Sequence, residues 1–126
     1  MKARYLLDTH VLLWLNSETS RIPRPVVAAL DLADQVYYSA ASVWELSIKQ
    51  SLGKIHLNAS ISRFSEQSQF LELPVTAKYA EAAAKLPLHH RDPFDRMLVV
   101  QAMIEGLALI TADRRLSSYS IEVLSI

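Results

Sequence analysis

The sequence contains no cysteine and only two glycines among its 126 residues. The absence of cysteine excludes a disulfide framework and thiol chemistry. Thirteen acidic and thirteen basic residues cancel, so the chain lacks the positive surplus of a protein that coats nucleic acid through a basic face. No segment approaches the roughly 20 apolar residues of a membrane span. Contact with nucleic acid must then be local or built by an oligomer, and we expect a cytoplasmic protein.

Hydrophobic residues make up 51% of the chain, a composition typical of a compact, helix-rich globular protein. The length fits one domain over residues 1–126. The first 15 residues look superficially like a signal peptide. Asp8 and His10 interrupt that apolar run, however, and no small-residue cleavage site follows it.

Short apolar or β-branched runs alternate with segments of helical pattern along the chain. We predict strands at 5–7, 36–38, 70–73, 107–110 and 121–126. We predict helices near 11–15, after Pro23 and Pro25, over 40–52 up to Gly53, from an Asn58 cap to about 69, from a Thr76 cap towards Pro87, over 93–104 before Gly106, and briefly near 113. The alternation predicts a three-layer α/β/α sandwich around a parallel sheet of about five strands.

Acidic residues follow these strands or lie early in the next helices, where such sheets bind ligands. Each has an ordinary structural explanation. Asp8 and Asp113 can cap the helices that follow them. Glu45 can complete a capping box with Ser42, or form an ion pair with Lys49 four residues on.

The segment HHRDPFDR at 89–96 has the best structural explanation of all. Asp92 fits the N-cap, Pro93 the first helical position, and Asp95 the third. The helix dipole accounts for Asp95 only in part, because an acid gains at most about 1 kcal/mol there. Asp95 is therefore the stronger candidate for chemistry.

Taken together, four of these acids predict a site. In a parallel sheet, Asp8, Glu45, Asp95 and Asp113 come from four segments that meet at one edge. Their carboxylates would repel one another unless a compensating charge lay beside them. A hard cation such as Mg²⁺ takes oxygen ligands, and such a cluster suits metal-assisted hydrolysis of phosphodiesters.

Other residue types are less informative. Paired His89 and His90 rarely face one metal, and no residue at zinc-ligand spacing accompanies them. The arginines near the acids can bind phosphate, although Arg96 fits an ion pair with those acids equally well. Several aromatic residues can stack on bases, but their spacing favours a place in the core or at an interface. The arginines are Arg91, Arg96, Arg114 and Arg115, and the aromatic residues are Trp14, Tyr37, Tyr38 and Trp44.

Four segments resemble the PIN-domain family, and more narrowly the VapC-type toxins of bacterial toxin–antitoxin pairs. They are LLDTHVLLW at 6–14, SVWELSIKQSLGKI at 42–55, HRDPFDRMLVVQA at 90–102 and LITADRRL at 109–116. The resemblance runs nearly end to end, and the DPFDR and WE…K…LGK segments are the specific ones. It implies a Mg²⁺- or Mn²⁺-dependent endoribonuclease that forms a homodimer and is inhibited by a small antitoxin protein.

The resemblance also implies roles for individual residues. The family's acids fall on Asp8, Glu45, Asp95 and Asp113. Asp8 and Asp95 would hold the main metal ion, and the other two would complete the cluster directly or through water. The supporting positions are Thr9, Asp92, Arg96 and Thr111.

Two other readings stay open. One is a Mg²⁺-dependent phosphatase with Asp8 as covalent nucleophile, although position 10 lacks the second acid that this enzyme class carries. The other is a partner-binding module with a vestigial site, against which the intact acids argue. The RNA target and the antitoxin cannot be read from the sequence.

Overall fold

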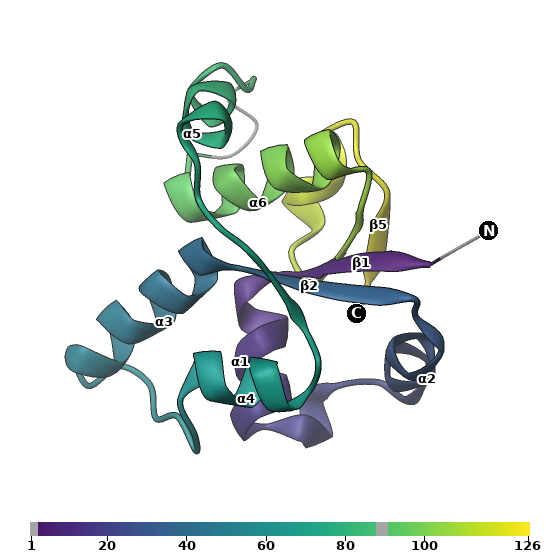
Figure 1. Cartoon of the computed structure of the whole chain (residues 1–126), viewed down its shortest axis with the longest axis vertical. Helices are drawn as coiled ribbons and strands as arrows, with labels where there is room; N and C mark the ends of the chain where they lie inside the picture. Colours follow the sequence, from purple (N-terminus) through teal and green to yellow (C-terminus); the bar gives the residue numbers. More distant parts are fainter. Residues whose placement is uncertain (1–2, 88–90) are drawn as a thin grey trace.

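The computed structural model describes residues 3–87 and 91–126, and its centre is one sheet of five parallel strands. The strand order is β3-β2-β1-β4-β5. The strands are β1 Arg4–Leu7, β2 Gln35–Ser39, β3 Leu71–Leu73, β4 Ala108–Thr111 and β5 Val123–Ser125. The predicted sandwich with a five-stranded parallel sheet is confirmed, and Figure 1 shows helices above and below the sheet.

The helices are longer than the strands and fill both outer layers. They are α1 Thr9–Ser17, α2 Arg24–Leu32, α3 Ala40–Ser51, α4 Ile61–Gln67, α5 Ala77–Ala84 and α6 Pro93–Glu105, with 3₁₀ turns η1 Thr19–Arg21 and η2 Arg114–Ser118. In the part of the chain that the structure describes, no helix combines the length and apolar character needed to cross a membrane.

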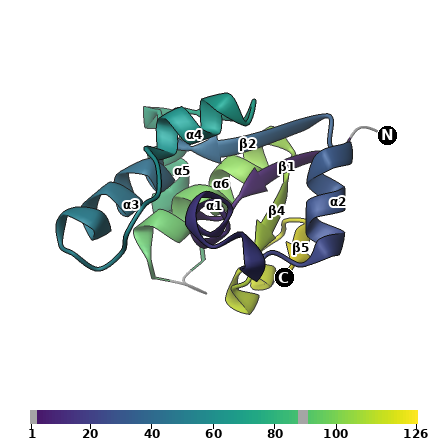
Figure 2. The same cartoon turned by 90° about the horizontal axis from the view of Figure 1, so that it is seen from below.

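Two hydrophobic cores, one on each face, hold the layers together. Successive strand residues point to opposite faces, so Leu6 packs into one core and Leu7 into the other. Leu109 and Ile110 of β4 divide in the same way, and all four side chains are fully buried. The core around Leu7 receives α1, α2, α3 and α4, and that around Leu6 receives α6 (Figures 1 and 2).

Most helix boundaries follow the predicted caps. Asp8, Thr76 and Asp92 cap α1, α5 and α6 through their side chains. Gly106 ends α6 at φ 66°, a left-handed conformation that favours glycine. The predicted helix at α4 is present, but the predicted Asn58 cap is wrong: the helix begins at Ile61, and the cap is Ser60, whose Oγ accepts from the amide of Arg63 at 3.4 Å.

The sheet topology places the candidate acids. Each strand's carboxyl end lies at the same edge because all strand pairs are parallel. Asp8 follows β1, α3 follows β2 and carries Glu45, and Asp113 lies two residues beyond β4. The N-terminus of α6 comes to this edge because its C-terminus leads into the start of β4. The fold thus brings four acidic segments to one edge.

Candidate acidic active site

Asp8 lies deepest in this acidic edge and is 2% exposed. One carboxylate oxygen accepts from the Thr9 amide at 2.7 Å, and the other accepts from the Thr111 hydroxyl at 2.6 Å. Burial raises the pKa of Asp8, and the hydrogen bonds from Thr111 and Thr9 offset part of that rise. Asp8 is therefore a helix cap and also a buried acid that β1 and β4 fix from two sides.

Asp113 is joined to Asp8 through Thr111. The Thr111 hydroxyl accepts from the Asp113 amide at 3.0 Å while it donates to Asp8. The Asp113 carboxylate caps η2 and accepts two hydrogen bonds from the Arg115 guanidinium, at 3.1 and 3.0 Å. A single threonine at the end of β4 therefore sets the spacing between two acids.

Glu45 is buried on α3 with one oxygen paired and one unpaired. Its Oε2 lies 2.9 Å from the ammonium nitrogen of Lys49, as the four-residue spacing predicts. Its Oε1 is buried and has no hydrogen-bond partner among the described residues. A buried carboxylate oxygen without a partner is costly, so this atom is a candidate for a ligand.

The predicted capping box of Ser42 and Glu45 is wrong. The N-cap of α3 is Ser39, whose Oγ accepts from the Ala41 amide at 3.1 Å. Ser42 is instead fully buried inside the helix, and its hydroxyl lies 2.8 Å from that of Thr9. Sequence reasoning missed this contact, which fixes α3 against the start of α1. The signal was present, since Ser42 and Glu45 share a helix face at three-residue spacing.

Asp92 and Asp95 differ in their environment at the start of α6. Asp92 Oδ1 accepts from the amides of Phe94 at 2.8 Å and Asp95 at 3.2 Å, so Asp92 is the N-cap as predicted. The Asp95 carboxyl is half-buried. Its pKa is raised to about 7, first by burial and then by the negative charges of Asp8, Asp92, Glu45 and Asp113. The negative charges of the other acids of this edge therefore all act on Asp95.

The acids interact through their charges without closing around a common point. Among residues 3–87 and 91–126, no three Asp, Glu or His side chains are grouped closely enough to hold an ion. Glu45 is drawn to Lys49 and Asp113 to Arg115. These two ion pairs place positive charge beside the outer acids of this edge.

Arg96 faces backbone carbonyls. It is buried, and its guanidinium donates to the carbonyl oxygens of Ala83, Leu86 and Pro87 at 2.8, 2.9 and 3.1 Å. These contacts tie the C-terminal end of α5 to α6. Arg91 and Arg114 are exposed, and His89 and His90 of the same motif lie outside the described residues.

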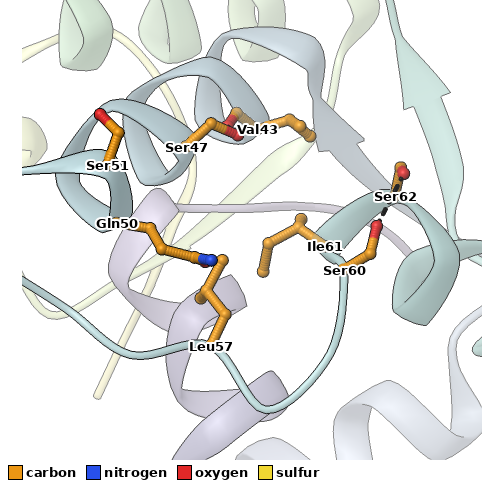
Figure 3. Close-up of a pocket in the computed structure, with 8 residues that line it drawn as sticks. All are labelled: Val43, Ser47, Gln50, Ser51, Leu57, Ser60, Ile61 and Ser62. Atoms are coloured by element: carbon orange, nitrogen blue, oxygen red, sulfur yellow. Dashed lines mark hydrogen bonds between the residues drawn. The ribbon is translucent and has the colours of Figure 1, made fainter. Parts of the chain in front are cut away.

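A surface pocket between α3 and α4 contains none of the acids (Figure 3). Its lining is hydroxyl, amide and aliphatic, without a charged side chain. Ser47 donates to the Val43 carbonyl and Ser51 to the Ile48 carbonyl, both at 2.7 Å. Ser60 and Ser62 bond to each other at 3.1 Å. Because these hydroxyls are engaged locally and no base lies beside them, we assign no chemistry to this pocket.

Asp92→Ala is expected to cost about 1 kcal/mol of stability, the usual loss for a removed N-cap. Two amides at the start of α6 would lose their acceptor. Asp92→Ser, which retains a capping oxygen, is the matched control. Thermal unfolding measures the loss, and the RNA cleavage that the family resemblance implies should persist in both variants. A stable but inactive Asp92→Ala protein would give Asp92 the role that we expect of Asp95.

Comparison with known proteins identifies the class to which this fold and acidic edge belong. Residues 5–122 match the PIN domain family, and the chain belongs to that family. Over 117 residues it is 31% identical to Ribonuclease VapC22 of Mycobacterium tuberculosis (strain ATCC 25618 / H37Rv), and the match covers 90% of each chain.

Solved structures show the same fold at lower identity. VapBC2 from Rickettsia felis, bound to a DNA fragment from its promoter, superposes with a TM-score of 0.71 at 13% identity, over 97% of this chain and 98% of that one. VapBC-5 from Mycobacterium tuberculosis, a member of the VapBC family of toxin–antitoxin systems, gives a TM-score of 0.60 at 19% identity, over 98% of this chain and 99% of that one. These likenesses confirm the architecture, and they carry no residue roles to this protein.

Proposed function

We propose that this protein is a divalent-metal-dependent endoribonuclease and the toxin of a toxin–antitoxin pair. Membership of the PIN domain family and the likeness to a ribonuclease over 90% of the chain support the proposal. One observation carries it: burial, and then the negative charges of Asp8, Asp92, Glu45 and Asp113, raise the pKa of Asp95 to about 7. Asp92 already caps α6, so capping does not account for Asp95 or for the four acids whose charges act on it. We take residues 1–126 as one catalytic unit that acts on RNA in the cytoplasm.

The donor set fits Mg²⁺ or Mn²⁺, because both ions prefer carboxylate oxygens. The buried, unpartnered Oε1 of Glu45 is an independent sign that this edge takes a ligand. We assign Asp8 and Asp95 as the main ligands, with Glu45 and Asp113 completing the set. When bound, such an ion lowers the pKa of a water molecule and neutralises charge on phosphoryl oxygens.

The protein's own residues prepare the site for a phosphodiester. Thr111 holds Asp8 and Asp113 in register through its hydroxyl. Thr9 supports the site from the other side, since its amide binds Asp8 and its hydroxyl meets Ser42. Lys49 and Arg115 bring positive charge beside two of the acids, which reduces the repulsion that a polyanionic substrate would meet. Asp92 and Arg96 act indirectly, by fixing the start of α6.

Two protein partners belong to the proposal. VapBC-5, one of the neighbours in fold, is a member of a family of toxin–antitoxin systems. By analogy, we propose a homodimer and an antitoxin encoded beside this chain. Light scattering of the purified protein tests the first partner, because a monomer at micromolar concentration contradicts it. A neighbouring reading frame for a small protein tests the second.

The direct experiment is cleavage of RNA by the purified protein with Mn²⁺ or Mg²⁺, repeated in EDTA. We expect internal cleavage with either ion and none in EDTA. Asp95→Asn should not cleave the RNA, and its matched control is Asp31→Asn, which removes the same charge from an exposed position in the last turn of α2. This helix ends at the opposite edge of the sheet, because β2 starts after it. Asp31→Asn should cleave like the wild type.

Two further results would distinguish the alternative functions. A phospho-aspartate trapped on Asp8 would establish the phosphatase reading, and its absence during turnover favours attack by water. If no RNA is cleaved with either metal ion, while the protein binds its neighbour-encoded partner, the vestigial module is the correct reading.

A further inference from the structure

A row of neighbouring aromatic and cationic side chains starts at the acidic edge and follows α1. His10 is exposed in the first turn of this helix, two residues beyond Asp8. Its ring centroid lies 6.2 Å from that of Trp14, one turn further along. The Arg21 guanidinium lies over the Trp14 ring at 4.5 Å from the centroid. We call these three residues, His10, Trp14 and Arg21, the α1 stripe.

The stripe leads away from the acids at which we propose that the phosphodiester is cleaved. Figure 1 shows α1 leaving the end of β1 and descending from the sheet, with η1 beyond it. Residues four apart on a helix lie one above the other, so His10 and Trp14 form a row that Arg21 continues. An RNA strand with a phosphate at Asp8 must continue over a surface beside the acids, and α1 is the element that Asp8 itself begins.

The chemistry of the stripe suits an unpaired nucleotide. Bases stack on aromatic rings and on arginine guanidinium planes, and cations bind the backbone phosphates. The Arg21 side chain is 56% exposed, and its ion pair with Glu18 is a surface contact of 3.3 Å. Exposed pairs of this kind contribute little, so a phosphate or a base can take the place of Glu18.

A second, more exposed tryptophan provides a contrast. Trp44 is 64% exposed and packs edge-on against Phe94 at 5.4 Å between ring centroids. It lines a hollow formed by apolar residues of α3 and α6 together with Val75. Among the residues that the structure describes, none that lines the hollow is charged, so these residues do not supply the cations that a nucleic-acid chain requires. Of the two tryptophans, we therefore assign RNA binding to Trp14, which has an arginine beside its ring.

We propose that the α1 stripe binds single-stranded RNA next to the cleaved phosphodiester, with bases stacked on His10, Trp14 and Arg21. The three residues position the substrate and take no part in bond cleavage. This inference rests on the proposed ribonuclease function and names the surface through which that activity would select unpaired RNA.

The test measures binding of a fluorescent oligouridylate in EDTA, where cleavage is absent, and steady-state cleavage of the same RNA with Mn²⁺. Trp14→Leu retains an apolar side chain against the core but removes the ring. Arg21→Gln and His10→Gln change only exposed residues, so they remain informative if Trp14→Leu unfolds. Trp44→Leu is the matched control.

We expect Trp14→Leu and Arg21→Gln each to weaken binding roughly tenfold and to raise KM with little change in kcat. Arg21→Gln should also reduce the slope of log affinity against log salt by about 0.7, the contribution of one phosphate contact on single strands. In Trp44→Phe, which leaves Trp14 as the only tryptophan, the oligonucleotide should quench the remaining fluorescence. Trp44→Leu should bind normally.

The proposal fails if the three stripe variants bind and cleave like the wild type. It fails equally if Trp14→Leu alters the oligomeric state and leaves RNA affinity unchanged, because the stripe would then be a protein interface. Asp95→Asn separates this inference from the proposed function, since it should bind the RNA without cleaving it. A wild-type protein that neither binds nor cleaves RNA refutes both.

Discussion

Asp95→Asn is expected to abolish metal-dependent RNA cleavage, with a loss of roughly a hundredfold or more, as for other groups that stabilise charge in a transition state. The substitution preserves side-chain shape and removes one negative ligand charge. Asp95 is the acid on which the charges of Asp8, Asp92, Glu45 and Asp113 converge. Removing its charge therefore disables the centre of the site.

The same variant should be more stable than the wild type when metal is absent and the pH is high. The folded pKa of Asp95 is about 7, above its unfolded value of 3.8. Between these values the native state holds a proton that the unfolded state has released, so stability falls as pH rises. Above pH 7 the folded protein bears the full cost of the ionised carboxylate. The amide that Asp95→Asn introduces does not titrate, so the cost disappears.

Melting in EDTA at pH 5 and pH 8 measures this effect. We expect the gain of Asp95→Asn over the wild type to be larger at pH 8. Asp31→Asn, at an exposed position, should show no such change. If Asp95→Asn cleaves RNA normally, or is less stable than the wild type at pH 8 in EDTA, the metal-site interpretation of this motif is wrong.

Local rules predicted much of this edge. Asp8 and Asp92 were expected as caps because capping depends on a few adjacent backbone amides, and both accept from them. The alternation of strands and helices predicted the parallel sheet, which alone brings Asp8, Glu45 and Asp113 to one edge. These features depend on short-range chemistry or on topology, and both leave a periodic signal in the sequence.

Choices among competing partners could not be predicted in this way. Ser39 and Ser42 are both acceptable caps for α3, and the start of the helix decides between them. Ser42 is then free to meet Thr9, thirty-three residues away in the sequence. The contacts of the Arg96 guanidinium with carbonyls at the end of α5 were likewise not predicted. Long-range packing determines these contacts.

The sequence also could not predict that the acids lie apart from one another. Lys49 and Arg115 are close to Glu45 and Asp113 in the sequence. The sequence did not show, however, how these cations affect the positions of the two carboxylates. In the structure both form ion pairs with these acids. The sequence predicts which acids share this edge, and the structure adds the two cations that pair with Glu45 and Asp113.

Mn²⁺ is accordingly expected to stabilise the folded protein. An ion that binds only the native state stabilises it by about 2.7 kcal/mol at 100 times Kd. For a chain of this size the melting temperature should rise on the order of 10 °C. The unpartnered Oε1 of Glu45 would gain a ligand, and the ion would offset both the burial and the neighbouring negative charges that raise the pKa of Asp95.

The gain from Mn²⁺ should depend on pH in the direction opposite to the metal-free stability. At pH 5 a proton occupies Asp95 and competes with the ion, whereas at pH 8 the carboxylate is free to bind it. The difference between melting temperatures with Mn²⁺ and with EDTA should therefore be larger at pH 8. Asp95→Asn should lose most of this difference, and Asp31→Asn should keep it. An unchanged melting temperature in millimolar Mn²⁺ at pH 8 would mean that the four acids do not form one metal site.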